Sequence, residues 1–141
     1  MAAIVACPSC GRRNRLPAVS TGRPRCAACR SFLPWLVDAD DATFDAAVDA
    51  PVPVVVDLWA AWCAPCRMVA PVLEGLARER AGGIKVVKVD VDRSPQVAAR
   101  YAVHSVPTLM LFERGRLTDR RAGALSALAL GQWLDAHLPP P

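Results

Sequence analysis

Three pairs of cysteines with the same internal spacing constrain this 141-residue chain more than any other feature. Two residues separate the members of each pair, and the pairs account for all six cysteines: Cys7/Cys10, Cys26/Cys29 and Cys63/Cys66. Because structural disulfides are rare in the cytosol, cysteine pairs in a cytosolic chain more often bind a metal or carry out redox catalysis. The grouping of the three pairs therefore decides what the chain can fold into.

The sequence carries no feature that would take it into or across a membrane. Met1–Ala6 has neither the basic start nor the long apolar stretch of a secretory signal. The longest apolar run begins at Val52, is interrupted by Asp57 and falls short of the ~18 residues that a membrane helix needs. We therefore expect a cytoplasmic protein with no membrane partner.

Charge is distributed unevenly along the chain, which indicates two units with different surfaces. Residues 1–37 contain six arginines and no acidic residue, whereas the rest of the chain carries the other 11 of its 17 basic residues and all 13 acidic residues. A content of 53% hydrophobic and 21% charged residues excludes wholesale disorder. We predict a small N-terminal module at residues 1–33 and a larger domain at residues 34–141.

The first two cysteine pairs have the spacing of a structural zinc site. Fifteen residues separate the pairs, and the pattern matches a tetrahedral site with four thiolate ligands: Cys7, Cys10, Cys26 and Cys29. Such a closed site has no open coordination position, so zinc would be structural and would supply folding energy to a segment with little apolar surface. The alternative is two additional redox dithiols. We predict one zinc ion in a zinc-ribbon-like module, and no organic cofactor.

Hydrophobic patterns after the module alternate between strand and helix. We expect strands at 54–59, 84–91, 108–112 and 116–122. Between and around them we expect four helices: a short helix from Phe44, a helix from the third cysteine pair to Gly82, a helix that opens at Ser94-Pro95, and a helix over 130–138. Asp41 should cap the first helix, and Pro71 should kink the second. The strand at 54–59 is apolar on both faces, which is typical of a central buried strand. This order predicts an α/β fold, a mixed sheet with helices on both faces.

The third cysteine pair lies where the central strand passes into a helix. A C-x-x-C at this position places Cys63 at the helix N-terminus, where unpaired N–H groups and the helix dipole stabilise a thiolate. Cys66 lies in the first helical turn, close enough to attack a mixed disulfide that Cys63 has formed. The alternatives are a buried inert dithiol and a third metal knuckle, and the flanking Trp62 and Pro65 and the lack of a further cysteine pair argue against both.

The residues around this pair resemble the active-site segment of the thioredoxin family. The segment runs from Val56 to Arg67 and reads V-D-L-W-A-A-W-C-A-P-C-R. The resemblance extends over roughly residues 36–138 through four further motifs: Lys88-Val89-Asp90, Val106-Pro107-Thr108, Gly115 and Gly123-Ala124. It implies a thioredoxin fold and a protein-disulfide reductase. Ala64 replaces the glycine usual in the family's W-C-G-P-C, and the two residues between the cysteines tune the redox potential. With its four-cysteine module, the chain resembles thioredoxins of the thioredoxin 2 type, which carry an N-terminal zinc site.

Two charged residues next to the redox pair have implied catalytic roles. Asp57 shares a strand face with Val55 and Trp59, so desolvation should raise its pKa, unless it lies at the strand end and reaches solvent. The resemblance implies that Asp57 lies behind Cys66 and exchanges a proton with it. It also implies that Lys88 pairs with Asp57, the alternative being a surface lysine.

The resemblance further implies a groove in which an extended peptide docks beside the cysteines. In the family the proline equivalent to Pro107 is cis and faces the cysteines, and the backbone of the preceding residue pairs with the substrate chain. The substrate-binding residues are then Trp62, Ala64, Pro65, Val106, Pro107 and Gly123. The expected partners are disulfide-containing client proteins and an NADPH-linked thioredoxin reductase, and we expect a monomer. Nucleic acid is not expected, because no aromatic residue is interleaved with the N-terminal arginines.

One alternative function belongs to a different class. The chain could be a zinc-ribbon binding or redox-sensing module that uses the thioredoxin domain as a scaffold, but that reading requires the redox motif to be dispensable. An oxidant or isomerase is disfavoured because no signal peptide is visible and no histidine lies between Cys63 and Cys66.

Overall fold

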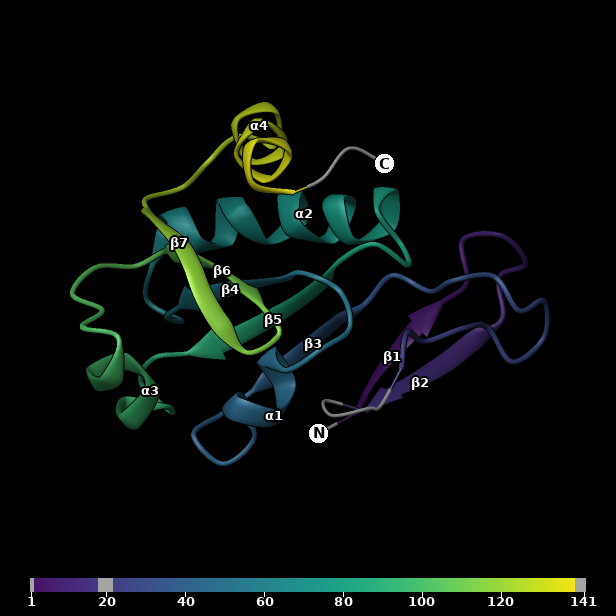
Figure 1. The fold of residues 1–141 in the computed structure, drawn as a ribbon, viewed down its shortest axis with the longest axis horizontal. Helices are drawn as coiled ribbons and strands as arrows, with labels where there is room; N and C mark the ends of the chain where they lie inside the picture. The colour runs from purple at the N-terminus through teal and green to yellow at the C-terminus, as the bar shows by residue number, and fades with distance from the viewer. Residues whose placement is uncertain (1, 18–21, 139–141) are drawn as a thin grey trace.

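The computed structural model describes residues 2–17 and 22–138, which contain two β-sheets (Figure 1). The smaller sheet is an antiparallel hairpin of β1 (Ala2–Ala6) and β2 (Arg13–Pro17). The larger sheet has the strand order β3-β5-β4-β6-β7. Its strands are β3 (Leu36–Ala39), β4 (Val54–Trp59), β5 (Lys85–Asp90), β6 (Thr108–Glu113) and β7 (Arg116–Ala122). β3 and β4 run parallel to β5, whereas β6 is antiparallel to both β4 and β7, so the sheet is mixed as predicted.

Helices cover both faces of the larger sheet. α2 (Ala64–Glu79) and α4 (Ala127–His137) lie over one face, and α1 (Phe44–Val48) and α3 (Pro95–Arg100) lie over the other (Figure 1). The predicted α/β architecture is therefore confirmed. Within the described residues, no helix combines the length and the apolar character needed to cross a membrane.

The central strand β4 separates two hydrophobic clusters. Val54, Val56 and Leu58 face the α1/α3 side, where Phe44 makes ring contacts with Tyr101 and Phe112 at centroid distances of 5.7 Å. Val55 faces the other side, in the cluster that also contains residues of α2 and α4. Because successive side chains of a strand point to opposite faces, a strand buried on both faces has a nearly continuous apolar sequence, and in β4 Asp57 is the single exception. The clusters therefore bury both faces of β4, the strand that leads into the segment with the third cysteine pair.

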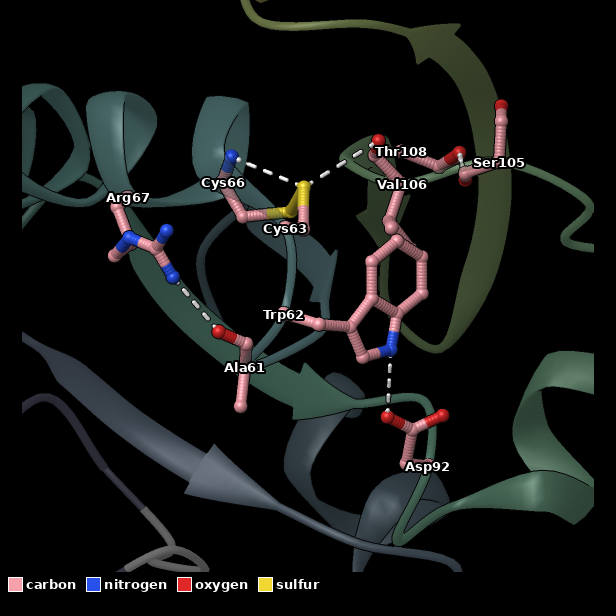
Figure 2. Close-up of a disulfide and its surroundings, with 9 residues drawn as sticks. All are labelled: Ala61, Trp62, Cys63, Cys66, Arg67, Asp92, Ser105, Val106 and Thr108. Atoms are coloured by element: carbon pink, nitrogen blue, oxygen red, sulfur yellow. Dashed lines mark hydrogen bonds between the residues drawn. A yellow bond between two sulfur atoms is a disulfide. The ribbon is translucent and has the colours of Figure 1, made fainter.

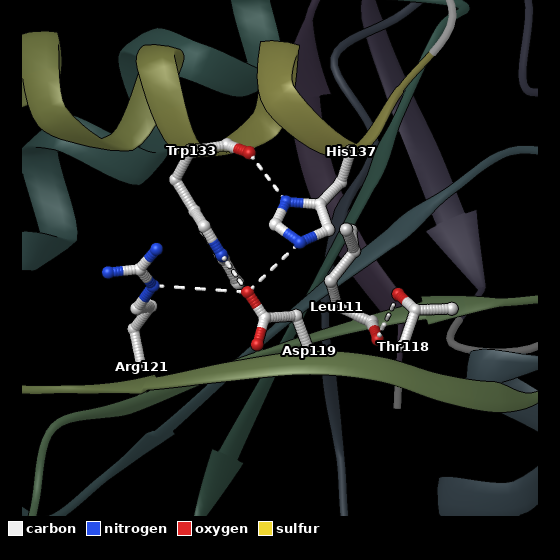
Figure 3. Close-up of polar contacts among 6 residues, drawn as sticks. All are labelled: Leu111, Thr118, Asp119, Arg121, Trp133 and His137. Carbon is white, nitrogen blue, oxygen red and sulfur yellow. Dashed lines mark hydrogen bonds and ion pairs between the residues drawn. The ribbon is translucent and has the colours of Figure 1, made fainter.

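A polar contact ties α4 to the sheet edge at β7. The Trp133 indole N–H donates to Asp119 Oδ2 at 2.7 Å, and His137 Nε2 and Arg121 Nε lie 3.1 and 3.9 Å from the same oxygen (Figure 3). The indole hydrogen bond is the main reason that the pKa of Asp119 lies below its ordinary value. A buried indole N–H thus finds its acceptor on the otherwise exposed edge strand.

The N-terminal segment contains two strands that its sequence pattern did not predict. Leu16 is the one fully buried side chain of β2, and it joins Leu33, Trp35 and Val37 in the cluster on the α1/α3 side of the sheet. Among the side chains described in the two hairpin strands, only Leu16 is fully buried, whereas Ala3 and Val5 of β1 are half-buried, so the pattern was too weak for either strand to be expected. β3 was missed for a related reason, since a four-residue edge strand that includes Asp38 carries an exposed charge and resembles a linker.

The end of α2 and the capping of the two short helices differ from the expected ones. α2 continues through Pro71 but ends at Glu79, and the glycines expected as its end lie in the following turn, where Gly82 has a φ of +87°. The short helices are capped differently from the prediction. Asp41 does not cap α1; its carboxylate accepts from the N–H groups of Gln96 and Val97, at 3.1 and 2.9 Å, and so caps α3. α1 and α3 lie on the same sheet face, which brings this carboxylate to α3, whereas Ser94 makes no capping hydrogen bond.

Candidate active site and metal centre

Cys63 and Cys66 form a disulfide at the beginning of α2 (Figure 2). Cys63 is the N-cap residue, and its Sγ accepts a hydrogen bond from the Cys66 N–H at 3.2 Å. The sulfur occupies the place that a serine or aspartate oxygen usually takes at a helix start, where N–H groups lack partners within the helix. Pro65 lies in the first turn, where a missing N–H costs nothing. The arrangement stabilises negative charge on Cys63 once the disulfide is reduced.

A cis peptide bond between Val106 and Pro107 faces this disulfide. The carbonyl oxygen of Val106 lies 3.6 Å from Cys63 Sγ (Figure 2), and Pro107 is buried at the start of β6. The Pro107 carbonyl accepts from the Gly123 N–H at 2.8 Å, which brings the end of β7 to the same place. Gly123 has a φ of +97°, a conformation that favours glycine. The Val106 carbonyl thus lies against the Cys63 sulfur, and Gly123 is bonded to the residue that follows Val106.

Trp62 and the residues between the cysteines form the exposed part of the site. The Trp62 side chain is 69% exposed, and its indole N–H donates to Asp92 Oδ2 at 3.0 Å (Figure 2). Ala64 and Pro65 are exposed as well. Asp92 was not among the predicted site residues. Its position two residues beyond the end of β5 was the available signal, because parallel strands β4 and β5 end at the same edge of the sheet.

Asp57 is completely buried in β4, and neither carboxylate oxygen has a hydrogen-bond partner among the described residues. It shares a strand face with Val55, which belongs to the α2/α4 cluster, so the carboxylate lies under the first turns of α2. Desolvation raises the pKa of Asp57 from 3.8 to about 6, and the charge of Lys88 opposes part of this rise. Lys88 is the direct register partner of Asp57 on β5, and its Nζ lies 5.4 Å from the centre of the Trp59 ring.

The other four cysteines converge in the N-terminal segment. All four Sγ atoms lie within 4.8 Å of one another. The Sγ atoms of Cys7 and Cys29 are 3.5 Å apart, and so are those of Cys10 and Cys26. Four ligands at the usual Zn–S distance of about 2.3 Å form a tetrahedron with S–S edges of roughly 3.8 Å. The cluster therefore has the ligand type, number and spacing that Zn²⁺ requires. Hydrogen bonds from the backbone of Cys29 and Ala28 lower the pKa of Cys26 to about 6, which favours the thiolate that binds metal.

Two turns, here called the first knuckle (residues 7–12) and the second knuckle (residues 26–31), supply these cysteines. They have the same backbone structure. In each, the first cysteine N–H donates to a carbonyl five residues later, Arg12 or Ser31, at 2.8 Å. The residue four positions after that cysteine is in the left-handed region, with a φ of +79° at Gly11 and +69° at Arg30. Glycine adopts this conformation freely, whereas Arg30 adopts it at a cost. The two halves of the cluster are thus equivalent in conformation but not in sequence.

Comparison with known proteins gives one family for the larger part of the chain. A family model described as Thioredoxin matches residues 35–136. Thioredoxin 1 of Nostoc is 52% identical over 99 residues, which cover 70% of this chain and 92% of that protein. The thioredoxins of Staphylococcus aureus and Pseudomonas aeruginosa are 45% and 43% identical over 103 and 104 residues, covering 73% of this chain and 98% and 96% of those proteins.

The matched region contains the disulfide of Cys63 and Cys66, the buried Asp57 and the cis Val106–Pro107 bond, whereas the four-cysteine cluster precedes it. Identity of this extent over nearly the whole length of the relatives, together with a redox disulfide at the start of α2, leaves no other assignment. The chain belongs to the thioredoxin family and is a protein-disulfide reductase of the thioredoxin type.

Proposed function

We propose that Cys63 attacks client disulfides and that Cys66 resolves the resulting mixed disulfide. The observation that carries this proposal is the position of Cys63 Sγ, which caps α2 and faces the Val106 carbonyl. In the dithiol form the Cys63 thiolate attacks one client sulfur, and the other client sulfur leaves and takes up a proton. The Cys66 thiol then loses its proton and attacks Cys63, which releases the client as a dithiol and forms the Cys63–Cys66 disulfide.

Asp57 is the group that accepts the proton from Cys66 in this scheme. With a pKa of about 6, its carboxylate is largely ionised at neutral pH, yet it holds a proton far more strongly than an exposed aspartate does. Lys88 favours the ionised carboxylate through its charge and so adjusts the pH at which Asp57 can act. Both are side chains of the α2 face of the sheet, since they alternate with Val56 and Val87 on the opposite face.

Client recognition would use the exposed surface around the disulfide. An extended client segment can pair with the backbone of Val106 at the open side of the cis bond, which is how a peptide adds to a sheet edge. Trp62, Ala64 and Pro65 would border the segment on one side, and Pro107 and Gly123 on the other. These contacts use backbone and apolar surface rather than specific charges, which suits a reductase with many protein clients. Re-reduction by an NADPH-linked thioredoxin reductase completes the cycle.

The four cysteines of the N-terminal segment would hold one structural Zn²⁺, as in thioredoxins of the thioredoxin 2 type. The support is the convergence of four thiolate donors: Cys7, Cys10, Cys26 and Cys29. Zinc bound there would stabilise the fold of the segment, and it has no part in the disulfide exchange. A module at residues 1–33, a domain at residues 34–141, a monomeric state and a cytoplasmic location all stay predictions.

Reduction of insulin with NADPH and thioredoxin reductase tests the redox assignments. We expect turnover by the wild type, none by Cys63→Ser, and accumulation of mixed disulfides with client proteins in Cys66→Ser. The matched control is the double variant Cys63→Ser/Cys66→Ser, which should trap no client. Turnover by Cys63→Ser, or equal trapping by the double variant, would overturn the roles of the two cysteines. Zinc quantitation on the same samples should give one ion per chain in every variant.

A further inference from the structure

Asn14 lies beside the four-cysteine cluster but contributes no metal ligand. It is the central residue of β2 and is half-buried, and the arginines on either side of it, Arg13 and Arg15, are exposed. Its side chain is therefore on the inner face of the hairpin, the same face as Leu16. Nothing in the redox chemistry at Cys63 and Cys66 requires an amide at this position.

The Asn14 amide makes three hydrogen bonds. Nδ2 donates to the Arg12 carbonyl at 2.9 Å and to Cys26 Sγ at 3.6 Å, and Oδ1 accepts from the Ala27 N–H at 3.0 Å. Both amide protons and one oxygen lone pair are thus engaged. Rotating the amide by 180° would place an oxygen against two acceptors and an NH₂ against a donor, so the partners fix its orientation.

These three bonds join the two halves of the cluster. Arg12 belongs to the first knuckle, because its carbonyl accepts from the Cys7 N–H, whereas Cys26 and Ala27 belong to the second. The paired backbone bonds described above each run within one knuckle. Asn14, which lies 12 residues before Cys26, therefore links the two turns to one another.

The same contact has a chemical consequence for a bound metal. Four thiolates on one Zn²⁺ leave the centre with two surplus negative charges, and N–H groups that donate to sulfur reduce the charge density on the ligands. Cys26 receives such a bond from Asn14 and another from the Ala28 N–H at 3.4 Å. Asparagine combines two donors with an acceptor on one planar group, which aspartate and serine cannot do.

We propose that Asn14 is a positioning residue of the zinc centre, which locks the two knuckles together and supports the Cys26 thiolate, so that retention of the metal depends on it. The proposal rests on the proposed function, since it requires that the four cysteines bind zinc. Loss of an outer contact to a metal ligand typically weakens metal binding 10–100-fold.

The test compares full-length wild type with Asn14→Ala and Asn14→Asp, and uses Arg15→Ala as the matched control on the exposed face of the same strand. Zinc release to a chromophoric chelator should be at least about tenfold faster for both Asn14 variants and unchanged for the control. Asn14→Asp keeps an acceptor for the Ala27 N–H but loses both donated bonds, to the Arg12 carbonyl and to Cys26 Sγ, so it separates the contribution of the donors from that of the acceptor. With Co²⁺ in place of zinc, the sulfur-to-metal charge-transfer band should move to longer wavelength in both variants, which a purely structural role would not cause.

The outcomes separate this proposal from the one it rests on. If the wild type takes up neither zinc nor Co²⁺, the zinc site itself is wrong. The role of Asn14 is wrong if the wild type holds one ion, both Asn14 variants release zinc at a rate within twofold of that of the control, and the Co²⁺ spectrum is unchanged. An Asn14→Ala protein that reduces insulin normally but holds no metal would support the proposal, because metal retention would then depend entirely on Asn14.

Discussion

Replacing Asp57 with asparagine should stabilise the oxidised protein above pH 6 and leave its stability unchanged at low pH. The side chain is fully buried without a hydrogen-bond partner in the described structure, and its pKa is raised from 3.8 to about 6. Because the folded state binds this proton more tightly than the unfolded state, wild-type stability is highest below pH 3.8 and falls as the pH rises to about 6. At about 1.36 kcal/mol per pKa unit, the rise from 3.8 to about 6 corresponds to a decrease of about 3 kcal/mol in the free energy of unfolding.

Asparagine is isosteric with the protonated carboxyl group, so Asp57→Asn should not show this loss. Urea unfolding of both proteins at pH 4, 5, 6, 7 and 8 isolates the contribution of Asp57, since every other titrating group is common to the pair. We expect the two free energies of unfolding to agree near pH 4 and to differ by about 3 kcal/mol at pH 8, roughly 10 °C in the unfolding temperature. Turnover of the variant should be reduced most near pH 7, where the wild-type carboxylate is ionised and can accept the Cys66 proton. A constant difference in stability at every pH, or a less stable variant at pH 8, would refute the burial argument.

Three other perturbations follow from the geometry of the two centres. Arg30→Gly should stabilise the second knuckle by about 0.5–1 kcal/mol, because the φ of +69° at this position favours glycine. We expect the variant to release zinc more slowly than the wild type. Lys88→Met should raise the pKa of Asp57 further, since the lysine charge now lowers it, and the midpoint of the rate–pH profile should rise with it. Asp92→Ala removes the acceptor of the Trp62 indole and should raise KM for protein clients several-fold with little change in kcat, whereas an equal fall in kcat would contradict a binding role.

Local patterns in the sequence predicted the parts of the molecule that depend on local interactions. The apolar run of β4, interrupted only by Asp57, and the cysteine pair after it predicted the centre of the sheet and the start of α2. The contacts that escaped prediction join residues far apart in the sequence. Asp41 caps a helix that begins more than fifty residues later, Trp62 pairs with Asp92 thirty residues on, and Asn14 reaches Cys26. A single aspartate or asparagine has no period and no motif, so only the folded backbone reveals its partner.

Through the buried cluster that includes Leu16, Leu33 and Trp35, a zinc ion held as proposed in the N-terminal segment would influence the stability of the larger sheet. Unfolding of the N-terminal segment would uncover Trp35 and Val37, which support β3 at the sheet edge. A ligand that binds only the folded state stabilises it by an amount that grows with the ratio of free ligand to Kd, about 2.7 kcal/mol when the free concentration is 100 times Kd. Metal supply would then determine how long each reductase molecule resists proteolysis, without any change in the chemistry at Cys63. The cell's zinc level would in this way set the amount of reducing capacity rather than its rate.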